Sequence, residues 1–196
     1  MKNKRSGLLG CLVCLALACT ALPAAGQEAK SAHLLGIGST NILDTYLSQE
    51  KYSGTGLTYL YIRERGKPDK CWSSVVEHEI SLASADDRSQ STSELEACYN
   101  LYWGYYHNWR LLDDHLRLQA GGLVNADLGF IYHLSSANNP VNARVGMNLM
   151  PSGIATYDFR LWQKPFSVRY ELNLPLVGVM FSPNYGQSYY EIFSLG

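Results

Sequence analysis

Carboxylates are the side chains in this sequence whose spacing most favours chemistry. Four of them form two pairs with i, i+2 spacing: Glu77 and Glu79, and Glu94 and Glu96. Residues two apart in a β-strand point to the same side, so a hairpin of these two segments would gather all four. Such a group could bind a cation. The sequence favours the alternative that they pair with Arg117 and Arg144, because buried charges need partners.

Other groups with catalytic residue types lack the partners that chemistry would need. Asp113-Asp114-His115 could hold a divalent cation, but a solvated hairpin turn explains it better. His133 and Ser135 share one side of a strand end without a third group. The chain has no GxSxG, HExxH, phosphate-loop or paired CxxC motif. The sequence therefore predicts no enzyme, with no catalytic residue, cofactor or metal site; a lipid-modifying barrel enzyme is the enzymatic alternative.

The remaining histidines and cysteines are dispersed. His78 and His107 lie on apolar faces near expected strand ends, which favours an interfacial position over metal ligation. A hairpin turning near residue 88 places Cys71 and Cys98 about seven residues apart along the strands, roughly 23 Å. A disulfide needs Cα atoms within about 7 Å. We therefore expect two free thiols.

Strands are the elements that must position these groups. Period-two alternation runs through 94–107, 116–132, 141–150, 155–161 and 166–174. In 116–132, Leu118, Val124, Leu128 and Phe130 alternate with Arg117, Asn125 and Asp127. Alternation over this many segments indicates strands with one apolar face. Turn residues such as Pro151-Ser152-Gly153 separate these segments. Noisier strands are expected at 54–63 and 71–83, and a last strand between Gln187 and Leu195. The prediction is therefore an all-β antiparallel meander of about eight strands.

Composition and charge exclude several classes of protein. The chain has 16 Lys+Arg and 17 Asp+Glu, a formal charge of −1; leaving out residues 1–26 gives 13 bases, 17 acids and −4. This balance excludes a basic nucleic-acid-binding protein. No apolar run after residue 26 is long enough for a membrane-spanning helix. Residues 1–26 combine a basic head, an apolar stretch and the small residues Ala24-Ala25-Gly26, which predicts a secretory signal peptide.

Alternation alone fits either a soluble barrel with an apolar interior or a membrane barrel with an apolar exterior. Segments 92–107 and 116–132 run about 16 residues, whereas soluble strands usually have about 3–10. Aromatic residues such as Trp103 and Phe166 lie on the apolar face, as in an interfacial girdle. The polar face carries charges of both signs, which suits a narrow, salt-bridged lumen. The predicted lumen-lining residues are Glu77, Glu79, Glu94, Glu96, Arg117, Asp127, Arg144, Asp158, Arg160, Arg169 and Glu171.

Two segments carry a family resemblance: Asn41-Ile42-Leu43-Asp44-Thr45-Tyr46-Leu47-Ser48 and Tyr52-Ser53-Gly54-Thr55-Gly56-Leu57. The chain resembles a group of uncharacterised Bacteroides-type outer-membrane β-barrel proteins of unknown function. The resemblance implies an up-and-down transmembrane β-barrel in the outer membrane of a Gram-negative bacterium. It carries over no functional residue, because the family has no established activity. Such barrels usually end on Phe or Trp, so the ending Phe193-Ser194-Leu195-Gly196 predicts a truncated C-terminus.

The expected organisation is a signal peptide at 1–26, an N-terminal segment at 27–53 and the barrel at 54–196. The expected partner is outer-membrane lipid, with no nucleic acid, while a protein or small-molecule partner stays undetermined. The predicted function is a structural element, or a narrow transport or adhesion element. The alternative from another class is a soluble periplasmic barrel that binds an apolar small molecule.

Overall fold

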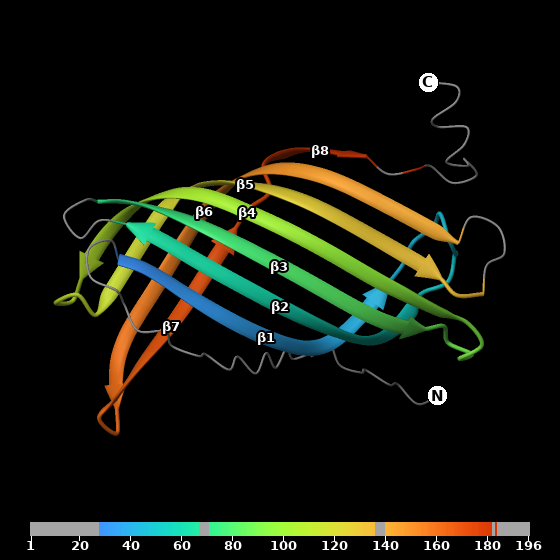
Figure 1. The fold of residues 1–196 in the computed structure, drawn as a ribbon, viewed down its shortest axis with the longest axis horizontal. Coiled ribbons are helices and arrows are strands. Elements are labelled where there is room, and N and C mark those ends of the chain that lie inside the picture. Colours follow the sequence, from blue (N-terminus) through green and yellow to red (C-terminus); the bar gives the residue numbers. More distant parts are fainter. Residues whose placement is uncertain (1–27, 67–70, 136–139, 182, 184–196) are drawn as a thin grey trace, which may run out of the picture.

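In the part of the chain that the structure describes, eight strands form one antiparallel sheet that curls into a half-barrel (Figure 1). A computed structural model describes residues 28–66, 71–135, 140–181 and 183. The strands are β1 (Glu28–Ile42), β2 (Tyr52–Gly66), β3 (Trp72–Asp86), β4 (Ser93–Leu111), β5 (Leu116–His133), β6 (Val141–Leu161), β7 (Lys164–Asn173) and β8 (Val177–Phe181). Neighbours from β1 to β7 pair in chain order, which confirms the predicted all-β meander. The predicted signal peptide and the predicted strand at 187–195 lie outside the described residues.

The two ends of the sheet have connections of different length. At one end, called here the long-turn end, the connections are 43–51, 87–92 and 134–140. At the opposite, short-turn end they are 67–71, 112–115 and 162–163. The tightest is Trp162-Gln163, where both residues have positive φ, as a two-residue hairpin with a type I′ turn requires. No helix among the described residues is long and apolar enough to cross a membrane.

Strand β6 runs without interruption through Pro151-Ser152-Gly153, so the predicted turn there was wrong. Residues 141–149 and 155–161 have the same alternation phase, which lets one strand contain both. The Pro151 carbonyl accepts a hydrogen bond from the Leu174 N–H. In an antiparallel strand the N–H and C=O of one residue point to the same side. The missing N–H of Pro151 therefore faces the interruption between β7 and β8, where the sheet tolerates proline.

Strands β7 and β8 lie one after the other along the same edge of β6. Asn173 is opposite Ser152 and Val177 is opposite Leu149. Between these pairs, three residues on one side (174–176) face two on the other (150–151), the offset of one that a β-bulge produces. The eight strands thus occupy seven positions across the sheet.

Strand β1 lies within the segment 27–53 that the sequence assigned to a lead-in. The alternation did not reveal it, because both of its faces carry apolar residues. Leu34 is half-buried on one face, while Leu35 and Ile37 on the other are 57% and 63% exposed. Gly36 and Gly38 weaken the pattern further.

Side-chain contacts that skip strands identify the concave face of the sheet. Arg117 on β5 forms an ion pair with Glu64 on β2, and Arg169 on β7 forms one with Glu77 on β3. A curled sheet brings such distant strands together only on its concave side. The polar residues of the alternation therefore point inward.

The convex face carries the apolar residues of the same strands. Val124, Leu128 and Phe130 on β5 are 38%, 54% and 39% exposed. The intervening Arg117 and Asp127 lie on the concave face and are half-buried. The charged residues of this alternation lie inside and its exposed apolar residues outside, as the alternation predicted. The concave face also holds a buried apolar cluster of Ile62, Val75, Tyr106 and Ile154.

Candidate functional site

Ion pairs and hydrogen bonds connect strands across the concave face. The Arg117 guanidinium donates to both carboxylate oxygens of Glu64, over 2.6 and 3.0 Å. The Gln119 amide donates to the same carboxylate at 3.1 Å and to the Ser73 hydroxyl at 3.1 Å. Glu64 is 6% exposed, so this bidentate pair supplies the partner that a buried carboxylate needs.

A second group lies on β3 and β7. Arg169 donates to Glu77 at 2.9 Å and also to Glu171. The Asn173 amide donates to the other oxygen of Glu171 at 2.9 Å. One arginine therefore compensates two carboxylates.

Closer to the long-turn end, Arg144 on β6 pairs with Glu96 on β4 over 2.9 Å. Glu79 accepts a hydrogen bond of 3.3 Å from the Tyr102 hydroxyl. Asp127 accepts one of 3.4 Å from the Asn148 amide. A Cβ at Gly146 would lie 2.2 Å from Asp127 Oδ2, so this glycine provides the room that the carboxylate occupies.

The predicted lumen-lining residues thus fall into three sets. The structure places eight of them in the polar network on the concave face: Glu77, Glu79, Glu96, Arg117, Asp127, Arg144, Arg169 and Glu171. Asp158 and Arg160 stay apart, exposed where β6 runs on towards the 162–163 turn. Glu94 is fully buried at the opposite end of the sheet. The four glutamates do not form one group, because Glu77, Glu79 and Glu96 each have a separate partner.

Sequence reasoning missed Glu64, the partner of Arg117. Its signal was available, since Glu64 follows Thr58, Leu60 and Ile62 at even spacing on β2. The flanking residues Arg63 and Arg65 are exposed on the convex side and made the segment look charged on both faces. Which arginine meets which carboxylate depends on the curl of the sheet, and no spacing along the chain contains that information.

The long-turn end of the concave face is closed by packed side chains. Ile42, Tyr52, Ala85 and Ile131 form a buried cluster, against which Leu47 packs. The Tyr52 hydroxyl lies 2.9 Å from His133 Nε2 and 2.9 Å from the Thr92 hydroxyl. This cluster includes Ile42 and Leu47 from the segment that carried the family resemblance, so that segment folds over the end of the half-barrel.

The cysteine geometry differs from the expected register. Ser81 is opposite Cys98, so paired residue numbers sum to 179 and not to about 176. Residues directly opposite each other share a face. Inward-facing residues have odd numbers on β3 and even numbers on β4, so the numbers of two paired residues must add to an odd sum. Cys71 and Cys98 are ten residues apart along the ladder, about 33 Å, and both thiols are free.

Histidines divide between the two faces. His33 and His78 lie among convex-face tyrosines, with Nδ1 atoms 2.7 Å from the Tyr59 hydroxyl and 2.8 Å from the Tyr99 hydroxyl. His133 points inward and is 9% exposed. Within the described ranges, no three His, Cys, Asp or Glu side chains are arranged to hold a metal ion.

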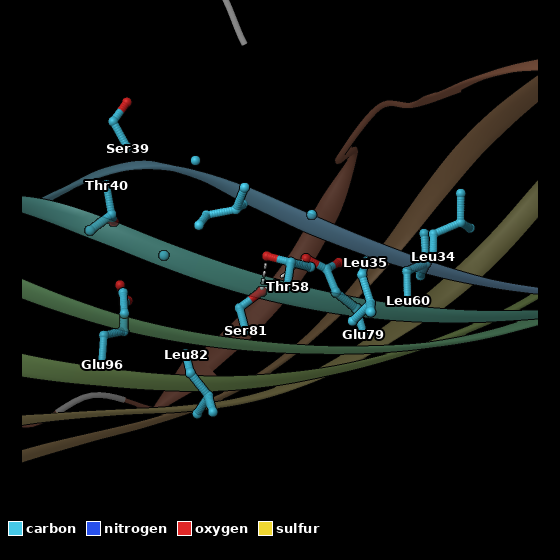
Figure 2. A pocket seen from close by; sticks show the side chains of 15 residues that line it. Leu34, Leu35, Ser39, Thr40, Thr58, Leu60, Glu79, Ser81, Leu82 and Glu96 are labelled. Carbon is cyan, nitrogen blue, oxygen red and sulfur yellow. Dashed lines mark hydrogen bonds between the residues drawn. The ribbon is translucent and has the colours of Figure 1, made fainter. Parts of the chain in front are cut away.

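A hollow of about 510 Å³ lies beside β1 (Figure 2). Small residues on β1, β2 and β3 create it, among them Gly36, Gly56 and Ala83. Thr58 and Ser81, whose hydroxyls are 3.0 Å apart, line it together with Glu79 (Figure 2). Among the described strands, β1 has a neighbour on one side only, so the hollow opens at a sheet edge.

The model of the family described as "Protein of unknown function (DUF3316)" matches residues 8–196. The chain belongs to this DUF3316 family. Comparisons with curated proteins and with solved structures gave no match. The predicted membership of an uncharacterised family is therefore confirmed, and the family description names no activity, substrate or location for a DUF3316 protein.

The turn at 87–92 in this DUF3316 protein permits a pH-dependent prediction. Asp87 accepts hydrogen bonds from the Ser89 hydroxyl at 2.7 Å, the Ser91 hydroxyl at 2.9 Å and the Ser91 N–H at 2.8 Å. The Ser89 hydroxyl first, and then the Ser91 and Thr92 donors, hold the pKa of Asp87 well below its ordinary value. A depressed folded-state pKa contributes stability that is present above the ordinary value, about 3.9, and is lost only as pH falls towards the folded value.

We expect the Ser91 amide to keep its protection from hydrogen exchange down to about pH 3, and Asp87→Ala to remove it at every pH. Exchange measured by mass spectrometry from pH 3 to 7 checks this. Asp86→Ala is the control, because Asp86 accepts from the Ser93 hydroxyl and not from the turn amides. Loss of protection with a midpoint near 3.9 in the parent chain would contradict the proposed role of Asp87.

Proposed function

We propose that this protein is an outer-membrane β-barrel whose lumen is filled by ion pairs and packed side chains. The observation that carries the proposal is the distribution of side chains over the two faces of the sheet. The convex face exposes Leu35, Leu128, Val145, Val168 and other large apolar residues. Soluble monomers rarely expose an apolar surface of this extent, whereas lipid solvates it.

The concave face supports the same proposal. Two of its buried carboxylates, Glu64 and Glu77, are paired with arginines. A soluble barrel that binds an apolar ligand would need the opposite arrangement, with an apolar interior. A lumen crossed by these ion pairs favours a structural or adhesion role, or passage of small solutes only, over a wide pore.

Connection lengths support an orientation. Membrane barrels have short periplasmic turns and longer extracellular loops. The short connections lie at the end of the sheet where β1 begins. In the proposed barrel, this end faces the periplasm, and the connection 43–51 faces the outside.

The barrel also requires that the free edges of the sheet be covered, because unpaired backbone groups are not tolerated in lipid. Seven strand positions are filled among the described residues, and β1 runs in the same direction as β7 and β8. One more strand antiparallel to β8 would also be antiparallel to β1, and would give the even number typical of such barrels. The strand predicted at 187–195 is the candidate in the sequence.

Extraction behaviour tests the proposal. We expect the expressed full chain to sediment with membranes, to dissolve only with detergent, and to migrate differently on a gel before and after heating. A protein that is fully soluble in buffer, with no change in mobility on heating, would overturn the proposal and favour the soluble barrel.

A further inference from the structure

One acidic group on the concave face is fully buried and has no partner for its charge among the described residues. Glu94 is 0% exposed, and neither of its carboxylate oxygens has a hydrogen-bond partner among the described residues. Glu96 lies two residues further along β4 on the same face, and Asp44 lies in the connection 43–51 at the same end of the sheet, so both nearby acids carry the same charge as Glu94. Glu96 is occupied by Arg144. The other buried glutamates, Glu64 and Glu77, have arginine partners, so the Glu94 position differs from the rest of the concave face.

Asp44 reaches the same region from the connection 43–51. It is 9% exposed, and its own turn holds it in place, because Asp44 Oδ1 accepts the Tyr46 N–H at 3.0 Å. Its other carboxylate oxygen accepts from the Asn142 amide on β6. Asn142 is 3% exposed, and its Oδ1 has no partner in the described part of the chain. Two carboxylates and an unsatisfied amide oxygen are therefore all buried at the long-turn end.

The remaining side chains nearby determine which ligand suits this group. His133 is paired with Glu94 across the β4–β5 ladder. However, its Nδ1 accepts the Ser135 N–H at 3.2 Å and its Nε2 faces the Tyr52 hydroxyl. Both His133 nitrogens are therefore engaged, and the described side chains at this position offer a transition metal no other nitrogen or sulfur ligand. A donor set of carboxylate and amide oxygens is the one that Ca²⁺ takes in proteins.

We propose that Glu94, Asp44 and Asn142 form a Ca²⁺ site at the long-turn end of the concave face. The ion neutralises Glu94 and Asp44, which have no arginine partner in the described part of the chain, and it ties β4 and β6 to the connection 43–51. Two carboxylates are few for Ca²⁺, and water completes the coordination of 6–8 oxygens that this ion prefers. The expected dissociation constant is therefore about 10⁻⁴–10⁻³ M, the range of extracellular calcium modules.

Calcium titration of the purified full chain tests the proposal, in whichever of detergent or buffer keeps it folded. After treatment with EDTA, we expect CaCl₂ to raise the midpoint of thermal unfolding by several degrees, saturating by about 10 mM, with MgCl₂ less effective. Isothermal titration calorimetry should give the dissociation constant directly. No stabilisation and no binding heat up to 10 mM CaCl₂ in the parent chain would overturn the proposal, and would indicate that a proton neutralises Glu94.

Two variants assign the site. Glu94→Gln keeps the shape and removes the charge, and Asp44→Asn does the same in the connection; each should weaken Ca²⁺ binding at least tenfold. Glu94→Gln should unfold no earlier than the parent chain in EDTA, because the buried charge is gone. Asp158→Asn, an exposed carboxylate on β6, is the matched control and should bind like the parent. Parent-like binding by both site variants would overturn the assignment. The outcome is independent of whether the protein spans a membrane.

Discussion

Leu128→Arg should destabilise the protein in a lipid bilayer by about 2–4 kcal/mol, the effect of an arginine near the bilayer midplane on the lipid face of a barrel. Leu128 lies on the convex face of β5, opposite Tyr99 and Val145. Strands β3, β4 and β5 are paired over 72–86, 93–107 and 120–133. Leu128 is therefore near the middle of the paired region, and its 54% exposure leaves room for the larger side chain.

The matched control is Leu112→Arg, which makes the same change at a 64% exposed residue in the 112–115 turn. Near the membrane surface the cost should fall to about 0–1 kcal/mol. Urea unfolding in liposomes gives both values. In a soluble protein, either substitution on an exposed surface would change stability by only about 0.5 kcal/mol. Equal, small effects at the two positions would therefore contradict the membrane orientation.

Arg117→Met should cost about 3–5 kcal/mol, because it leaves the buried Glu64 carboxylate without its cation. The pair connects β5 to β2 across the concave face, with side chains 19% and 8% exposed. The Gln119 amide would be the remaining donor to Glu64, and one neutral donor does not compensate a buried charge.

Two further variants test whether burial of the ion pair causes the loss of stability in Arg117→Met. Arg110→Met removes the partner of Asp114 in a pair that is 4.0 Å apart and 51% and 69% exposed, so it should cost at most about 1 kcal/mol. Adding Glu64→Gln to Arg117→Met removes the orphaned charge and should recover most of the loss. Unfolding free energies of the four chains check these values. A loss at Arg117 no larger than at Arg110 would show that the concave face is open to water.

The alternation was sufficient to predict which side chains lie on the same face of the sheet, because a period of two leaves only one choice of face for each strand. It assigned Val124 and Leu128 to one face and Arg117 and Asp127 to the other, as the structure has them. It failed where both faces carry similar residues, as in β1, and where turn-type residues lie within a strand, as at Pro151. Phase continuity across Pro151 was the better guide.

The sequence could not predict which arginine pairs with which carboxylate on the concave face. Alternation places Glu64 and Arg117 on the same side but gives no distance between β2 and β5, which depends on the curl of the whole sheet. The curl of the sheet likewise determines that Glu94 pairs with no arginine in the described part of the chain. Its i, i+2 neighbour Glu96 meets Arg144, so spacing along the chain could not separate the two.

Tryptophan quenching distinguishes a convex face covered by lipid from one that meets water. Trp103 lies on the convex face, paired with Val76 and Val124, and is 57% exposed. In a variant with Phe at positions 72, 109 and 162, this residue is the one tryptophan left. Folded into liposomes, it should be strongly quenched by phospholipids brominated on their acyl chains and little quenched by aqueous iodide. Quenching by iodide with no response to brominated lipid would show that the convex face meets water, and would contradict the proposed membrane barrel.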